Sequence, residues 1–149
     1  MIFCIYNKQD ERRPRAKIDE FKLVSRQTRH VWIVFDLTDT FTRWLAVQRY
    51  ARKCLQESHL LLLFLPWYLS FINQEFTSFL QEKAVDEQAV VALKGVGSLF
   101  GLLGVVYNLA PLINGRLLVF PPGSYKQNNY KLLDSYDGWN YFVIPIAVE

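Results

Sequence analysis

The sequence predicts a mainly α fold, with a helical bundle-like centre of three to four helices and an irregular C-terminal tail. Between residues 39 and 115, apolar residues recur at helical spacing or cover every side of a segment. Residues 116–149 instead carry Pro121-Pro122-Gly123, Asn128-Asn129 and Asp137-Gly138, which favour turns and short extended pieces. We therefore divide the chain into an N-terminal arm with a short apolar segment (1–37), a helical domain (38–118) and a loop-rich tail (119–149).

The N-terminal 37 residues alternate between apolar and charged stretches. Residues 1–6 are apolar and predict a strand or a loosely held terminus, and residues 7–22 are charged and indicate an exposed segment. Residues 30–37 are rich in β-branched and aromatic side chains, which favours a strand, although their length also permits a buried helix. The first 57 residues hold 12 Lys and Arg against 7 Asp and Glu, but a net charge of +3 predicts no nucleic-acid partner.

Residues 39–57 predict an amphipathic helix. Asp39 is a candidate N-cap, and apolar side chains such as Trp44 and Leu45 recur at helical spacing. Four cations lie largely off that stripe, namely Arg43, Arg49, Arg52 and Lys53. A basic amphipathic helix either turns its charges toward water or lies on a membrane surface.

Two longer apolar segments follow. Residues 60–73 are apolar on every side, so they are expected to be buried in protein or lipid, and Pro66 is expected to kink the helix or end it near Leu65. Residues 81–88 are polar and predict a connection, after which a second apolar segment begins at Ala89.

The uncharged run of residues 95–115 has two interpretations. Its 21 residues are long enough to cross a bilayer, as one span of a helical hairpin, and Gly97 and Gly101 form a GxxxG pair that permits close helix approach. Asn108 and Pro111 are costly inside lipid, however. We favour a helix that is buried against protein and ends near Asn108. Gly97, Gly101 and Gly104 are the predicted packing or partner interface.

The sequence contains no complete catalytic or metal-binding pattern. The two histidines, His30 and His59, have no local metal-ligand partner or nucleophile. Cys4 and Cys54 lie 50 positions apart and form no CxxC motif, which indicates two free thiols. We predict no catalytic residue, no metal ligand and no cofactor bound by this chain alone.

Two stretches resemble the C-terminal helical domain of peroxisomal acyl-CoA oxidases. In residues 86–118, the positions of Leu99-Phe100, Gly104, Asn108 and Gly115 match the intervals of a family helix and the turn after it. In residues 133–141, LDSYDGWNY resembles the tyrosine-aspartate-glycine signature of the family, carried here by Tyr136, Asp137, Gly138 and Tyr141. The chain lacks counterparts of the flavin-binding domains and of the segment with the catalytic glutamate, and it does not end in a peroxisomal tripeptide.

The resemblance implies a helical fragment of a flavin-dependent acyl-CoA oxidase with a packing or dimerisation role, inactive alone. FAD and a peroxisomal location are implied only through the family. The alternative is a non-catalytic helical-hairpin subunit of a membrane protein complex. Both interpretations predict that the chain binds a protein partner or a second copy of itself. The membrane-subunit alternative also predicts contact with a membrane.

Overall fold

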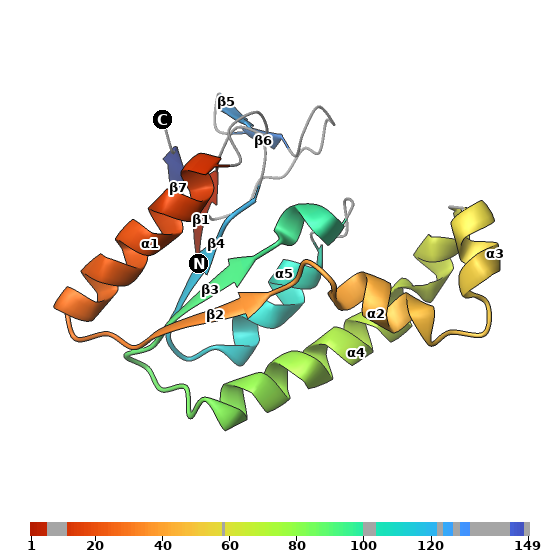
Figure 1. The fold of residues 1–149 in the computed structure, drawn as a ribbon, viewed down its shortest axis with the longest axis horizontal. Helices are drawn as coiled ribbons and strands as arrows, with labels where there is room; N and C mark the ends of the chain where they lie inside the picture. Colours follow the sequence, from red (N-terminus) through yellow and green to blue (C-terminus); the bar gives the residue numbers. More distant parts are fainter. Residues whose placement is uncertain are drawn as a thin grey trace.

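In a computed structural model, the chain folds around a five-stranded parallel sheet (Figure 1). The structure describes residues 1–5, 12–57, 59–99, 104–121, 124–126, 129–131 and 144–147. The sheet has the order β2-β3-β4-β1-β7, made by β1 (Ile2–Ile5), β2 (Trp32–Asp36), β3 (Val90–Lys94), β4 (Arg116–Val119) and β7 (Ile144–Ala147), with every neighbouring pair parallel. The mainly α prediction is therefore wrong, and the fold is α/β.

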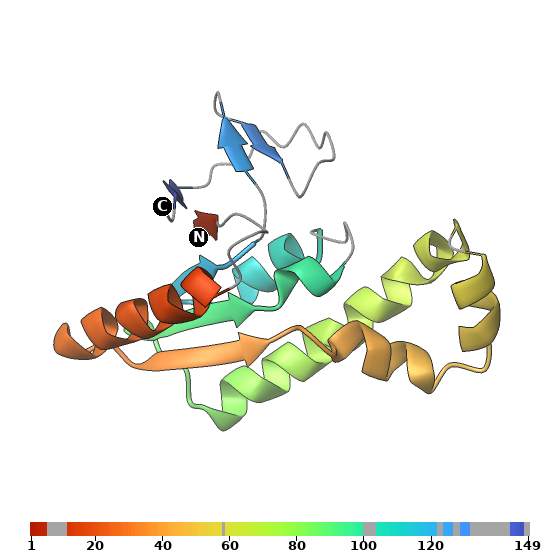
Figure 2. The ribbon, with the colours of Figure 1, turned by 45° about the horizontal axis from the view of Figure 1, so that its top comes forward.

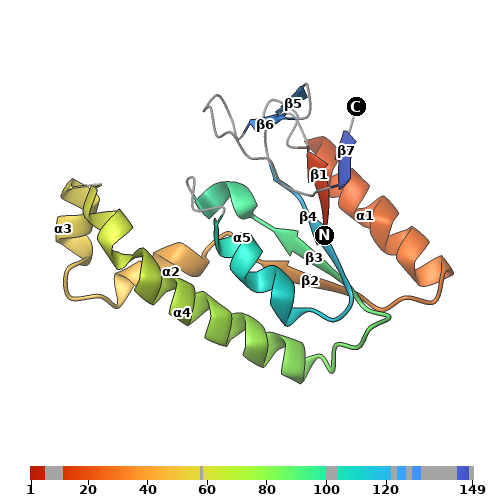
Figure 3. The same cartoon turned by 180° about the vertical axis from the view of Figure 1, so that it is seen from behind.

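Helices lie on both faces of this sheet. The described helices are α1 (Arg12–Gln27), α2 (Thr40–Ala46), α3 (Ala51–Gln56), α4 (His59–Glu82) and α5 (Gly104–Leu109), with the short 3-10 helices η2 (Val96–Leu99) and η3 (Ala110–Leu112), and not all of them contact the sheet. Seen from behind, α4 and α5 lie across the sheet, while α1 lies on the opposite face (Figure 3). Connections through α1 and through α4 and α5 thus produce three layers.

Two apolar cores follow from the alternation of side chains along the strands. On the α1 face, Cys4, Ala92 and Leu118 pack with Ile18 and Phe21. The larger core, on the other face, contains buried side chains of four strands and of α2, α4 and α5, namely Phe3, Ile5, Phe35, Trp44, Leu45, Tyr68, Ile72, Phe76, Val91, Leu93, Val105, Val106, Leu109, Leu117 and Val119.

The segment that begins at Ala89 was expected to be helical and is instead the central strand β3. Its residues Val90–Leu93 are buried on both faces of the sheet, so the strand is a continuous apolar run without alternation. In the sequence, such an apolar run cannot be distinguished from a segment of a buried helix. Strand β3 and most of β4 also lie inside residues 86–118, the longer stretch on which the oxidase resemblance rests.

The alternative of a hairpin of two membrane-spanning helices is also wrong. Among the described residues, no helix combines the length and the apolarity that crossing a bilayer requires. The uncharged run of residues 95–115 contains η2, α5 and η3, and α5 ends at Leu109. The run therefore supplies short helices that connect β3 to β4 on one face of the sheet.

Other local expectations have mixed outcomes. Residues 39–57 form two helices, α2 and α3, because a turn around Gln48 interrupts the predicted single helix. Pro66 does not end the helix near Leu65, since α4 continues through it for 24 residues in all. The strand preference of residues 30–37 is confirmed by β2. In the tail, β5 (Ser124–Lys126) and β6 (Asn129–Lys131) pair antiparallel, and Pro145 lies in β7 at the sheet edge, where a missing backbone donor is tolerated.

Candidate functional site

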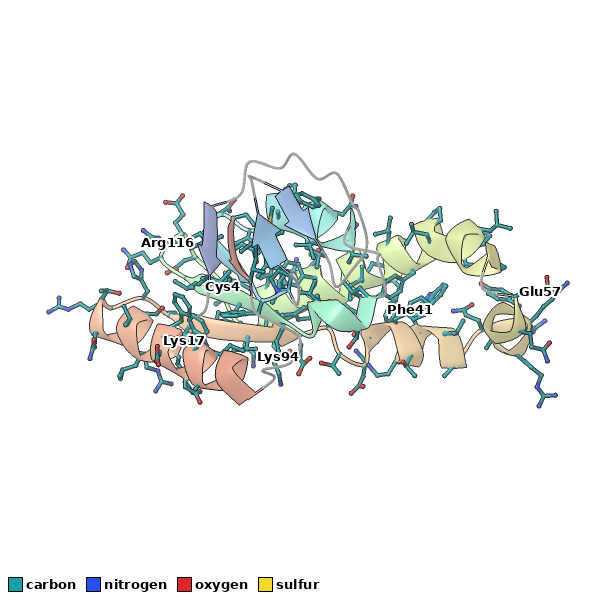
Figure 4. All side chains as sticks on the ribbon, turned by 90° about the horizontal axis from the view of Figure 1, so that it is seen from above. Cys4, Lys17, Phe41, Glu57, Lys94 and Arg116 are labelled. Carbon is teal, nitrogen blue, oxygen red and sulfur yellow. The ribbon has the colours of Figure 1, made fainter. Side chains whose placement is uncertain are left out.

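Helices α2, α3 and α4 form a helical extension, residues 40–82, that projects beyond the sheet. Figure 2 shows the second half of α4 beside the strands, while α3 and the first half of α4 lie well outside them. In Figure 4, Phe41 marks the place where the extension leaves the sheet and Glu57 marks its far end. A projecting element of this kind exposes a large surface that the chain itself does not cover.

The base of the extension is held to the sheet by buried polar contacts. Thr40 Oγ1 donates to the carbonyl oxygen of Leu37 at 2.9 Å, so it receives the hydrogen of Tyr68 Oη, which also lies at 2.9 Å. Both side chains are buried, and burial raises the pKa of Tyr68 despite its hydrogen bond to Thr40 and the nearby charge of Arg43. This contact joins the start of α2 to the middle of α4.

A second set of contacts lies at the carboxyl ends of β2 and β3. Asp36 accepts hydrogen bonds from the backbone N–H and the hydroxyl of Thr38, and Lys94 Nζ lies 3.1 Å from its second carboxylate oxygen. Burial raises the pKa of Asp36, but these hydrogen bonds and the charge of Lys94 outweigh it, so the pKa is lowered overall. Carboxyl ends of parallel strands often bind ligands. Here, both carboxylate oxygens are already engaged by the chain.

Gly95 allows these two strand ends to meet. Its φ is +76°, and a Cβ placed on it would lie 2.4 Å from Thr38 Oγ1 and 2.5 Å from Thr38 N. Only glycine adopts this backbone conformation without strain and leaves room for Thr38. The residues at this edge therefore fix the direction in which the extension leaves β2.

Aromatic rings continue along the extension from its base to its far end. Phe41 and Trp44 of α2 contact Tyr68 with ring centroids 5.1 Å and 5.4 Å away. Farther out, Tyr50 stacks on Phe64 at 4.0 Å with an interplanar angle of 10°. These contacts make α2 and the turn before α3 pack as one unit with α4.

Three large apolar side chains at the far end remain exposed. Val47 is 78% exposed, Leu63 is 65% exposed and Trp67 is 58% exposed. Leu63 and Trp67 are one helical turn apart on α4, and the Trp67 ring lies 5.2 Å from Phe64, which places it beside the Tyr50–Phe64 stack. Clustered apolar side chains rimmed by polar groups mark binding sites on soluble domains.

Three cations lie in the same part of the extension, in α3 and in the turn before it. Arg49, Arg52 and Lys53 are exposed, and no ion pair joins any of them to another residue in the described part of the chain. Arg43, nearer the base, lies 3.4 Å from Glu75. We call the six residues Val47, Arg49, Arg52, Lys53, Leu63 and Trp67 the distal patch.

The residues predicted from the sequence as an interface lie elsewhere. Gly97 is in η2 and Gly104 is the first residue of α5, while Gly101 lies outside the described residues. A Cβ on Gly104 would meet no atom within 4 Å, so nothing within the chain requires glycine there. The interface role of the three glycines stays a prediction. Tyr136, Asp137, Gly138 and Tyr141 also lie outside the described residues.

Sequence reasoning recognised the components of the distal patch without combining them. The three cations were assigned to the polar face of a helix, and residues 60–73 were expected to be buried on every side. The helix α4 satisfies that expectation on one side only, because Tyr68 and Ile72 are buried while Leu63 and Trp67 face solvent. A helix that is apolar all round, beside a helix with unpaired cations, is the signal that could have identified the patch.

Comparisons with known proteins do not place the chain in a family. No family model, no curated protein and no solved structure matches it. The resemblance to acyl-CoA oxidases stays a prediction. Within the described residues, no group of three or more His, Cys, Asp or Glu side chains could hold a metal ion.

Proposed function

We propose that this chain is an assembly subunit, an α/β platform whose helical extension binds a protein partner. The observation that carries the proposal is the distal patch, where Val47, Leu63 and Trp67 are more than half exposed at the end of a rigidly packed extension. Exposed Trp and Arg side chains are the types that contribute most to binding energy at protein interfaces. The packing role implied by the oxidase resemblance also gives the chain a partner, whereas FAD is implied by that resemblance alone.

The structure of the extension supports a binding role because its internal contacts are already complete. Tyr68, Thr40 and Trp44 hold α2 against α4, so the distal side chains are not needed to stabilise it. Anchors held in place before binding lose less conformational entropy when a partner covers them. The extension can therefore present Leu63 and Trp67 in a fixed geometry.

Site-specific photo-crosslinking tests this proposal. A photoreactive phenylalanine analogue is placed at Val47 or Trp67, and at Gln27, an exposed residue at the end of α1 on the opposite face of the sheet, as the control. The chain is expressed in the cells that naturally produce it, and adducts are identified by peptide sequencing. We expect one discrete protein adduct from Val47 and Trp67, and none from Gln27. An adduct with twice the chain's mass would identify a second copy as the partner.

A double variant separates binding from folding. Leu63→Ser combined with Trp67→Ser should abolish the adduct from Val47 and leave the urea midpoint of unfolding unchanged, because both side chains are exposed. Equal crosslinking from Val47, Trp67 and Gln27, or an adduct that survives the double variant, would contradict the proposal.

A further inference from the structure

We infer that the partner presents an amphipathic helix whose acidic residues gather at one end, and that this helix lies along the exposed face of α4. The inference rests on the proposed function and adds the chemistry of the partner. Three features of the extension carry it: the distal cations, the uncharged exposed face of α4, and the groove on that face.

The cations determine the charge of the partner. Arg49, Arg52 and Lys53 are exposed and form no ion pair within the described residues. Arginine binds carboxylates through two parallel hydrogen bonds, and two of the three cations are arginines. An acidic partner therefore gains attraction at this end of the extension, while a basic partner is repelled.

The exposed face of α4 determines the shape of the partner. From Leu63 to Gln81, the exposed side chains of α4 are uncharged: Leu63, Pro66, Trp67, Ser70, Gln74, Thr77, Ser78 and Gln81. At 1.5 Å per residue this face is about 27 Å long, which matches a helix of about five turns. Between Leu63 and Gln81 the one charged residue of α4 is Glu75, which lies beside this face, is 42% exposed and already pairs with Arg43.

A groove on the same face favours a shaped partner over a flat lipid surface. Ser70, Asn73, Gln74, Thr77 and Ser78 line a shallow depression of about 350 Å³. Short side chains such as Ser70 and Ser78 allow a second backbone to approach, and side-chain ridges of one helix fill grooves of another. All five lining side chains are polar, and a protein partner can form hydrogen bonds with them whereas lipid acyl chains cannot.

The charges also fix the direction of the partner along α4. The three cations of the distal patch, which have no ion pair among the described residues, lie near α3, whereas Arg43 and Lys83, nearer the other end of α4, are paired with Glu75 and Glu82. The acidic end of the partner helix is thus expected next to α3, with Leu63 and Trp67 contacting its apolar residues. Its remaining contact residues are expected to be apolar or uncharged.

Two synthetic helical peptides test the inference. They share an apolar face at positions i, i+3, i+4 and i+7 over five turns, and one carries four Glu at one end where the other carries four Lys. Binding to the full chain is measured by fluorescence anisotropy of the labelled peptides. We expect the wild type to bind the Glu peptide at least 10-fold more tightly than the Lys peptide, with a preference that falls as salt is raised.

Charge reversal provides the variant and its control. Arg49→Glu, Arg52→Glu and Lys53→Glu together should reverse the preference, so that the Lys peptide binds more tightly. Lys83→Glu, which changes an exposed cation after the other end of α4, should leave the preference as in the wild type. Unchanged urea midpoints verify that each variant is folded.

Each remaining outcome overturns the inference in a distinct way. Equal binding of the two peptides would contradict the inference that the partner is acidic. If neither peptide binds but Trp67 still gives a discrete adduct in the crosslinking, the partner is not a helix of this kind, and the proposed function still holds. Tighter binding to vesicles with 30% phosphatidylserine than to the Glu peptide would assign the distal patch to a membrane. If neither peptide binds and Trp67 gives no adduct, the proposed function itself is contradicted.

Discussion

The two halves of α4 lie in contrasting environments. The second half packs on the sheet, where Ile72 and Phe76 are fully buried and Phe76 contacts Phe35 of β2 with ring centroids 4.8 Å apart. The first half leaves the sheet and exposes Leu63 and Trp67 to solvent. One continuous helix thus has one half buried against the sheet and another half that packs on α2 and α3, with Phe64 stacked on Tyr50, but leaves Leu63 and Trp67 exposed.

This contrast shows that apolarity serves two purposes in the molecule. Phe76 removes apolar surface from water during folding, which is the main favourable contribution to stability. Trp67 leaves about half of its surface in water, so the corresponding gain is available only when another molecule covers it. Matched substitutions in the two halves of α4 should therefore affect different properties.

The largest effect is expected from truncation of Phe76. Phe76→Ala removes a fully buried ring and should lower the free energy of unfolding by about 3–5 kcal/mol. Trp67→Ala on the same helix should change it by less than about 0.5 kcal/mol, because the ring is mostly exposed. Urea titration followed by circular dichroism measures both values. Similar losses for the two variants would show that the distal end is part of the stabilising core.

The same contrast explains which parts of the fold could be predicted from the sequence. The helical character of α2 and α4 was predicted, because apolar spacing and capping are local signals. The strand character of β2 was also favoured, because the β-branched and aromatic composition of residues 30–37 is a local signal as well, although their length left a buried helix open. Residues whose environment follows from their neighbours in the sequence are open to this reasoning.

The central strand β3 and the sheet itself could not be predicted in this way. Val90–Leu93 pair with β2 on one side and with β4 on the other, and these partners are far away in the sequence. A strand covered by helices on both faces loses the alternation that identifies strands. The distal patch was missed for a related reason: Tyr50 meets Phe64 only after α3 folds back on α4, so the exposure of Trp67 is a tertiary property.

A smaller effect is expected at the junction of the sheet and the extension. Gly95→Ala places a Cβ 2.5 Å from Thr38 N at a positive φ, and should lower the free energy of unfolding by about 2–3 kcal/mol. Gly104→Ala is the matched control, since its Cβ meets open space, and should change that free energy by less than about 0.5 kcal/mol. Thermal unfolding of both variants gives the comparison. A Gly95→Ala variant as stable as Gly104→Ala would show that the junction adapts without strain.

The smallest effect concerns the ion pair at that junction. The pKa of Asp36 is lowered in the folded chain, so its carboxylate contributes stability above its unfolded pKa of about 4, and this contribution is lost as the pH falls through the lower folded value. Asp36 and Lys94 are both nearly half exposed, so solvent screens the pair. Asp36→Asn should therefore lower the free energy of unfolding by about 0.2–1 kcal/mol at pH 7.

The pH dependence distinguishes the charge of Asp36 from its hydrogen bonds. The amide oxygen of Asn can still accept the N–H of Thr38, so the variant removes the attraction to Lys94 while the turn persists. The stability difference between the wild type and Asp36→Asn should shrink as the pH falls below the unfolded pKa of about 4 and through the lower folded pKa, because the carboxylate then loses its charge. Lys83→Met, which disrupts the more exposed pair with Glu82, should leave stability unchanged at every pH. A difference for Asp36→Asn that does not change with pH would mean that hydrogen-bond geometry, not charge, holds the extension to the sheet.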